Sequence, residues 1–141
     1  MSESRAKERE RVFRLLFSAE FQKGATAEEL LSAFLEAEEL EGVSDYVKDT
    51  FFGAFAFSEI ALAKAVSVSR GWTAERMSPA MRALLKLSLY EILKTDIPTG
   101  IAANEAVELC KQYEDERGAK FLNGILGTVS RAEAGEKEAE A

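Results

Sequence analysis

Apolar residues recur along most of the chain at intervals of three or four, which is the spacing of one face of an α-helix. The helices that this pattern predicts cover approximately residues 5–22, 27–41, 45–69, 79–95, 100–114 and 118–132. No segment alternates between apolar and polar residues as an exposed strand does. We therefore expect an all-α fold.

Capping residues indicate where several of these helices begin and end. Thr26 followed by Glu29 has the pattern of a capping box, and Ser78-Pro79 places a serine N-cap before a proline at the first helical position. Gly24 and Gly42 are expected to end the first two helices, because glycine adopts the left-handed closing conformation at little cost.

Within the helices, Gly53 predicts a kink or a close helix crossing. The segment 79–95 is apolar on more than one face, which predicts a position at the centre of the core. The apolar stripes are expected to bury Phe21 and Tyr113. Residues 132–141 carry no such stripe, and we expect them to form a disordered charged tail.

Composition limits the class of protein. Hydrophobic residues make up 47% and charged residues 30% of the 141 residues, a balance typical of a folded domain. No apolar stretch approaches the ~20 residues of a membrane span, and the charged N-terminus does not resemble a signal peptide. The single cysteine, Cys110, excludes an internal disulfide and favours a reducing compartment. We expect a cytoplasmic protein without a membrane partner.

Charge is distributed unevenly along the chain, whose net charge is −7. Residues 20–49 hold nine acids and two bases, whereas residues 5–14 hold five bases and two acids. The basic segment allows two interpretations: a binding face, or a solvated helix with intrahelical ion pairs such as Arg5 with Glu8.

The residues offer little for catalysis. The chain has no histidine, which is the commonest general base and metal ligand near neutral pH. Cys110 lies on the apolar side of its predicted helix, and no phosphate-binding loop or nucleophile motif occurs. We expect a binding protein without catalytic residues, metal or cofactor.

Two places combine the cations and aromatic rings that bind phosphates and unpaired bases. One is the predicted first helix, with Arg5, Lys7 and Arg9. The other is YEDERGAKF before the last predicted helix, where aromatic and basic residues alternate. Burial of Phe121 in the core and simple solvation of Arg117 are the competing interpretations.

The second half of the chain resembles the NusB family. LLKLSLYEI, DIP, ANEAVELCK and KFLNGIL follow one another in that family's order and near its spacing, over residues 79–127. RAKERERVFRLLF is similar to the family's opening arginine-rich helix. The resemblance implies a single domain over residues 1–131, with seven helices in two packed subdomains of about 1–70 and 71–131.

The resemblance also implies a function in transcription antitermination. The protein would bind the boxA segment of nascent single-stranded RNA together with NusE, a small-subunit ribosomal protein. This complex would join elongating RNA polymerase, notably during ribosomal RNA synthesis. Family members occur as monomers and as homodimers, and both states stay open here.

The implied contacts fall on two sets of residues. The RNA-binding set comprises Arg5, Lys7, Arg9, Tyr113, Arg117, Lys120 and Phe121, and the partner-binding set comprises Phe17, Met81 and Arg82. Met81 stands where relatives usually have an acidic residue, and Glu8 and Glu10 dilute the basic segment. We therefore expect RNA binding to depend more on the partner than on the chain's own charge.

Two alternatives remain from the sequence. The chain could be the NusB-like accessory domain of a ribosomal RNA cytosine methyltransferase, or a helical scaffold for protein partners that does not bind RNA.

Overall fold

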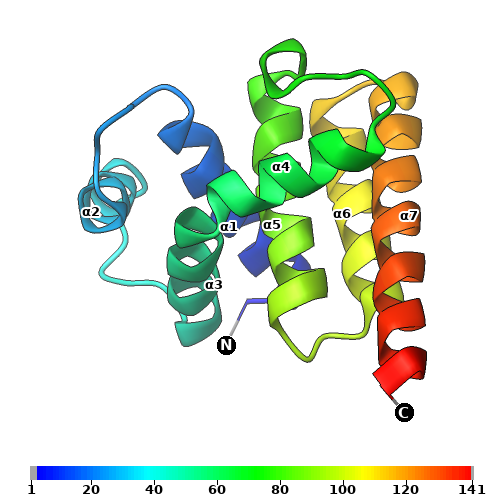
Figure 1. The fold of residues 1–141 in the computed structure, drawn as a ribbon. Coiled ribbons are helices and arrows are strands. Elements are labelled where there is room, and N and C mark those ends of the chain that lie inside the picture. The colour runs from blue at the N-terminus through cyan, green and yellow to red at the C-terminus, as the bar shows by residue number, and fades with distance from the viewer. Residues whose placement is uncertain (1–2, 141) are drawn as a thin grey trace.

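A computed structural model of the chain describes residues 3–140 and contains seven α-helices and one short 3₁₀-helix in that range (Figure 1). The elements are α1 (Arg5–Ala19), α2 (Ala27–Ala37), α3 (Asp45–Ala56), α4 (Ser58–Val68), η1 (Ala74–Arg76), α5 (Pro79–Lys94), α6 (Thr99–Tyr113) and α7 (Glu116–Glu140). No strand occurs in the described residues, and the predicted all-α class is confirmed.

Helix α5 lies at the centre of the fold, as its apolar pattern predicts. It packs against α1, α3, α4, α6 and α7, and Leu84, Leu85 and Leu89 on it are fully buried. Helix α2 lies at the edge of the bundle and contacts only α1 and α3 among the stronger helix contacts (Figure 1). The buried residues of both halves form one continuous hydrophobic core.

The predicted helix starts are confirmed. The Thr26 hydroxyl accepts a hydrogen bond from the Glu29 backbone N–H (3.1 Å), and the Glu29 carboxylate accepts one from the Thr26 N–H (3.0 Å). Ser78 accepts from the Met81 N–H (3.0 Å), with Pro79 at the first helical position. These caps depend on residues three positions apart, so the sequence alone reveals them.

Two helices end earlier than predicted. Helix α1 ends at Ala19, and the chain then turns toward Gly24, which has a φ of 91°. The prediction for Gly42 is wrong, because α2 is closed by Glu39, which adopts a left-handed φ of 54°. The Leu40 N–H then donates to the carbonyl of Leu35 (2.9 Å), which is the closing bond of a Schellman-type helix end.

The segment predicted as one helix over 45–69 is two helices. Helices α3 and α4 meet at Phe57 and are bent by 65°. Gly53 marks a close crossing with α5, since a Cβ at this position would lie 2.2 Å from the Tyr90 hydroxyl oxygen. The bend adds the seventh helix that the apolar spacing alone did not separate.

No single helix within the described residues has the length and apolar composition of a membrane span. Helices α3 and α4 together satisfy that test, but only as a pair bent by 65°.

Helix α7 continues to Glu140, through residues where we predicted a disordered tail. The missing apolar stripe predicts that these residues do not pack on the core. It does not oppose helix formation, because alanine and glutamate, which dominate this segment, have high helix propensity. Residue 141 lies outside the described range.

Candidate nucleic-acid interface

All five basic residues of α1, here called the α1 bases, form ion pairs with carboxylates. The pairs are Arg5 with Glu8 (3.3 Å), Lys7 with Glu10 (3.2 Å), Arg9 with Glu91 (2.9 Å), Arg11 with Glu3 (2.8 Å) and Arg14 with Glu38. The first two pairs are intrahelical and exposed on their basic side, as one of the two interpretations of this segment predicted. Such pairs contribute only about 0.2–0.5 kcal/mol each, so a phosphate could displace the carboxylate.

Arg9 differs from the other α1 bases because it is buried. Its guanidinium donates two hydrogen bonds to the Glu91 carboxylate (2.9 and 3.3 Å), and the Tyr46 hydroxyl donates a third to Glu91 (2.8 Å). Burial lowers the pKa of Arg9, but the hydrogen bond and the charge of Glu91 outweigh burial, and the pKa is raised. Arg9 is 6% exposed, so its charge is used inside the fold and does not face solvent.

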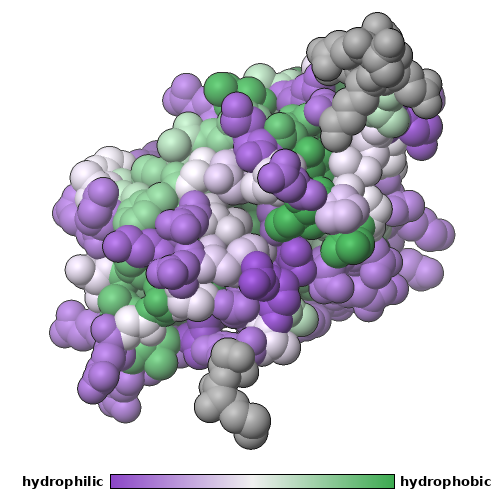
Figure 2. All heavy atoms as spheres, turned by 90° about the horizontal axis from the view of Figure 1, so that it is seen from below, coloured by the Kyte–Doolittle hydropathy of each residue, from purple (hydrophilic) through white to green (hydrophobic). Residues whose placement is uncertain are grey.

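Tyr46 links this buried pair to the surface. Burial, followed by the charge of Glu91, raises the pKa of its hydroxyl, which therefore remains protonated and donates to Glu91. The Arg5 guanidinium lies over the Tyr46 ring, 3.9 Å from its centroid. The N-terminus lies at the lower side of the molecule in Figure 1, and Figure 2 views the molecule from below, with hydrophobic patches separated by hydrophilic side chains.

The second predicted place lies at the α6–α7 connection, at the top of Figure 1. Arg117 and Lys120, here called the α7 bases, are exposed on the first turns of α7. Asp115 caps this helix by accepting a hydrogen bond from the Gly118 N–H (2.9 Å). Among the side chains that the structure describes, neither α7 base forms an ion pair.

Phe121 is half-buried, and its ring lies 5.4 Å from that of Trp72, centroid to centroid. Trp72 precedes η1 and is 46% exposed, and Arg76 of η1 is also exposed. Neither Trp72 nor Arg76 belongs to the set of residues that we predicted to bind RNA. The sequence feature that could have indicated them is the presence of a tryptophan and an arginine in the otherwise small and polar segment GWTAER, residues 71–76.

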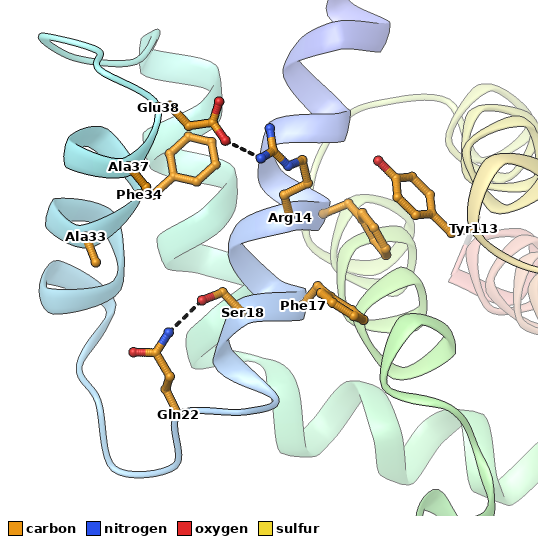
Figure 3. Close-up of a pocket in the computed structure, with 10 residues that line it drawn as sticks. Arg14, Phe17, Ser18, Gln22, Ala33, Phe34, Ala37, Glu38 and Tyr113 are labelled. Carbon is orange, nitrogen blue, oxygen red and sulfur yellow. Dashed lines mark hydrogen bonds and ion pairs between the residues drawn. The ribbon is translucent and has the colours of Figure 1, made fainter.

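Tyr113 ends α6 and is 41% exposed, so the prediction that it is buried is wrong. Its ring packs on Phe13 at 4.5 Å, and burial together with the charge of Glu10 raises the pKa of its hydroxyl. Tyr113 lies at the edge of a pocket of about 450 Å³ between α1 and α2 (Figure 3). Across that pocket, Arg14 extends toward Glu38, the residue that follows α2.

An aromatic row continues along α1. Phe17 lies 5.8 Å from Phe13 and 5.1 Å from Phe21, measured between ring centroids. Phe21 is 64% exposed, in contrast to its predicted burial, because it lies beyond the end of α1. Of the three residues predicted to bind the partner, Phe17 is half-buried beside this exposed ring.

The other two predicted partner residues are largely used within the fold. Met81 is 4% exposed. The Arg82 guanidinium donates to the carbonyls of Ala74 (3.1 Å) and Met77 (2.6 Å) and pairs with Glu20. Arg82 therefore holds η1 and its flanking turn against α1 and α5.

Cys110 is fully buried. Burial, followed by the charges of Glu114 and Asp115, raises the pKa of its thiol to about 11, so the thiol is protonated at neutral pH. Within the described residues, no group of three or more acidic, histidine or cysteine side chains is arranged to hold a metal ion.

Comparison with known proteins identifies one family throughout. The sequence profile of the NusB family matches residues 6–131. The chain is 34% identical to the transcription antitermination protein NusB of Pediococcus pentosaceus over 134 residues, which cover 93% of this chain and 100% of that protein.

Solved structures agree with the sequence comparison. NusB of T. maritima superposes with a TM-score of 0.79 at 27% identity, over 93% of both chains. A chain in a crystal structure of the antitermination factors NusB and NusE in complex with double-stranded RNA superposes with a TM-score of 0.77 at 25% identity, over 91% of this chain and 96% of that chain.

Proposed function

The chain belongs to the NusB family of transcription antitermination proteins, and we propose that it binds boxA-type single-stranded RNA beside a NusE-type small-subunit ribosomal protein. Its function is transcription antitermination, and the family is not enzymatic. In this proposal the RNA–protein complex joins elongating RNA polymerase in the cytoplasm and supports ribosomal RNA synthesis.

The observation that carries the proposal is the exposed set at the α6–α7 connection. Arg117 and Lys120 are cations without a carboxylate partner among the described side chains, and Phe121 lies beside them with its ring partly accessible. Arg117 and Phe121 are four residues apart on α7 and so share one face of the helix. Cations next to aromatic rings are what an unpaired base and its phosphate require.

The α1 bases contribute unequally to the proposed RNA face. Arg5 and Lys7 are available once their exposed ion pairs open, and Tyr113 offers an accessible ring farther along the bundle. Arg9 acts by holding α1 against α5, because its guanidinium is committed to Glu91. We therefore propose direct RNA contacts for Arg5 and Lys7 and an indirect role for Arg9.

For the ribosomal-protein partner we propose the aromatic row around Phe17. Phe21 exposes a large apolar ring next to it, and a partner that covers both would remove that surface from water. Met81 supplies no charge to this interface, so we expect the partner to be bound mainly through apolar contacts.

An electrophoretic mobility shift with boxA RNA tests the proposal, with and without the NusE-type protein. We expect weak binding by the chain alone and tighter binding with the partner, because two linked surfaces gain avidity. Absence of RNA binding in both conditions at low salt would contradict the proposal and favour the scaffold without RNA binding. The accessory-domain alternative is less favoured, since the similar proteins are transcription antitermination proteins.

Whether the free protein forms a homodimer is a separate question. Sedimentation of the chain with and without RNA would answer it, and RNA-dependent dissociation of a dimer would indicate that dimerisation covers the RNA face.

A further inference from the structure

A groove of about 290 Å³ lies where η1 meets the start of α7. We call it the Trp72 groove. Its walls include Trp72, Arg76, Met81, Arg117 and Phe121. The volume is just below the range of small-molecule pockets, about 300–1,000 Å³, and suits one planar ring system better than a larger ligand.

The backbone holds the Trp72 ring at the mouth of this groove. Arg70 and Gly71 both adopt left-handed conformations, with φ of 53° and 95°, and reverse the chain just before Trp72. The Ser69 hydroxyl donates a hydrogen bond to the Trp72 carbonyl (3.0 Å). Trp72 remains 46% exposed although the Phe121 ring lies beside the indole, tilted by 58°. The ring is therefore fixed in place and still accessible.

Two guanidinium groups line the groove with the indole. The Arg76 guanidinium lies 5.7 Å from the Trp72 ring centroid, and Arg117 lines the groove from α7. Neither forms an ion pair within the described part of the chain. The carboxylate that lines the groove, Glu114, accepts a hydrogen bond from the Ser78 hydroxyl. The groove thus combines an accessible aromatic face with two available positive charges.

We propose that the Trp72 groove is a base-stacking subsite for single-stranded RNA. An unpaired nucleobase stacks on the Trp72 indole, and Arg76 and Arg117 bind the phosphates on either side of it. This inference rests on the proposed function and deepens it, because it assigns Trp72 and Arg76 to the RNA face. A planar aromatic platform in a groove with two cations matches a nucleotide better than an apolar side chain of a protein partner.

Trp72 is the only tryptophan of the chain, so its fluorescence reports on this groove alone. The experiment titrates the full chain with single-stranded boxA RNA while following tryptophan emission. We expect saturable quenching with the same midpoint as the mobility shift. An oligonucleotide of the same length without bases should bind weakly and leave the emission unchanged.

Substitutions provide a second readout. Trp72→Leu should weaken RNA binding by about 5- to 100-fold, the range for loss of one base–aromatic stack, whereas Trp72→Phe should retain most of the affinity. Ile60→Ala is the matched control, because it removes another large exposed apolar side chain, on α4 and outside the groove. Circular dichroism checks that the variants are folded, and the fluorescence titration of the unaltered chain does not depend on them.

The outcomes separate this inference from the proposed function. RNA binding in the mobility shift without any change in Trp72 emission would overturn the subsite and leave the RNA-binding function intact. Quenching by the NusE-type protein alone, and not by RNA, would assign the groove to the protein partner and also overturn it. No RNA binding at all would overturn both.

Discussion

Two basic regions of this chain look alike in sequence and differ in the fold. The α1 bases are more numerous, but each is paired with a carboxylate, and Arg9 is buried. Arg117 and Lys120 follow three acidic residues, Glu114, Asp115 and Glu116, yet neither base forms an ion pair in the described part of the chain. The charge that can meet a phosphate depends on pairing and exposure more than on the number of basic residues.

The two sets of bases should also differ in how they affect the stability of the fold and the binding of RNA. A buried, doubly hydrogen-bonded pair such as Arg9–Glu91 makes one of its partners costly to remove, whereas an exposed base without a partner contributes little to stability. The α1 bases should therefore affect folding in proportion to their burial, and the α7 bases should affect RNA binding with little effect on folding.

The largest expected effect is on stability. Arg9→Ala leaves the Glu91 carboxylate buried without its main partner and should lower the free energy of unfolding by about 3–5 kcal/mol. Arg117→Ala, the matched control, should change it by less than about 0.5 kcal/mol. Urea denaturation followed by circular dichroism measures both. Similar urea midpoints for Arg9→Ala and Arg117→Ala would contradict this prediction, because they would show that the buried ion pair adds no stability that the exposed base lacks.

A smaller effect is expected from Tyr46→Phe, which tests the link between the buried pair and Arg5. The change removes the hydroxyl that donates to Glu91 and keeps the ring under the Arg5 guanidinium. Loss of one hydrogen bond to a buried carboxylate should cost about 1–2 kcal/mol in urea denaturation. Because the ring remains, RNA affinity at low salt should stay unchanged; a loss of affinity in the folded variant would mean that the hydroxyl, and not the ring, positions the RNA face.

The smallest effect concerns the exposed pairs of α1. Glu10→Gln frees Lys7 and should raise RNA affinity by about two- to fivefold at low salt, in line with an exposed ion pair of at most ~1 kcal/mol. Glu108→Gln is a suitable control, because it frees Lys111 on α6, outside the proposed RNA face. Equal gains from the two changes would indicate a general charge effect and not a specific release of Lys7.

Much of the fold could be predicted from the sequence because it depends on neighbouring residues. The capping box at Thr26, the N-cap at Ser78 and the central position of α5 each follow from residues within a few positions or from a single periodic pattern. The helix end at Glu39 was missed, because glutamate rarely adopts a left-handed conformation and gives no local signal.

The candidate site was harder to predict, because its properties depend on residues distant in sequence. Arg9 and Glu91 are 82 positions apart, and nothing near Arg9 indicates that its charge is neutralised inside the core. Likewise, Trp72 is brought to Phe121 only by the packing of the chain before α5 against α7. The aromatic and basic residues of YEDERGAKF and the family resemblance pointed to Arg117, Lys120 and Phe121, whereas the contribution of Trp72 and Arg76 required the structure.

The central claim is that the α7 bases, and not the α1 bases, supply most of the charge available to RNA. The most direct test is the salt dependence of boxA RNA affinity for two variants that each lose two positive charges. One is Arg117→Gln with Lys120→Gln, and the other is Arg5→Gln with Lys7→Gln. Each lost phosphate contact on a single strand reduces the slope of log affinity against log salt by about 0.7. We predict a reduction of about 1.4 for the α7 variant and less than half of that for the α1 variant; an equal or larger reduction for the α1 variant would contradict the claim.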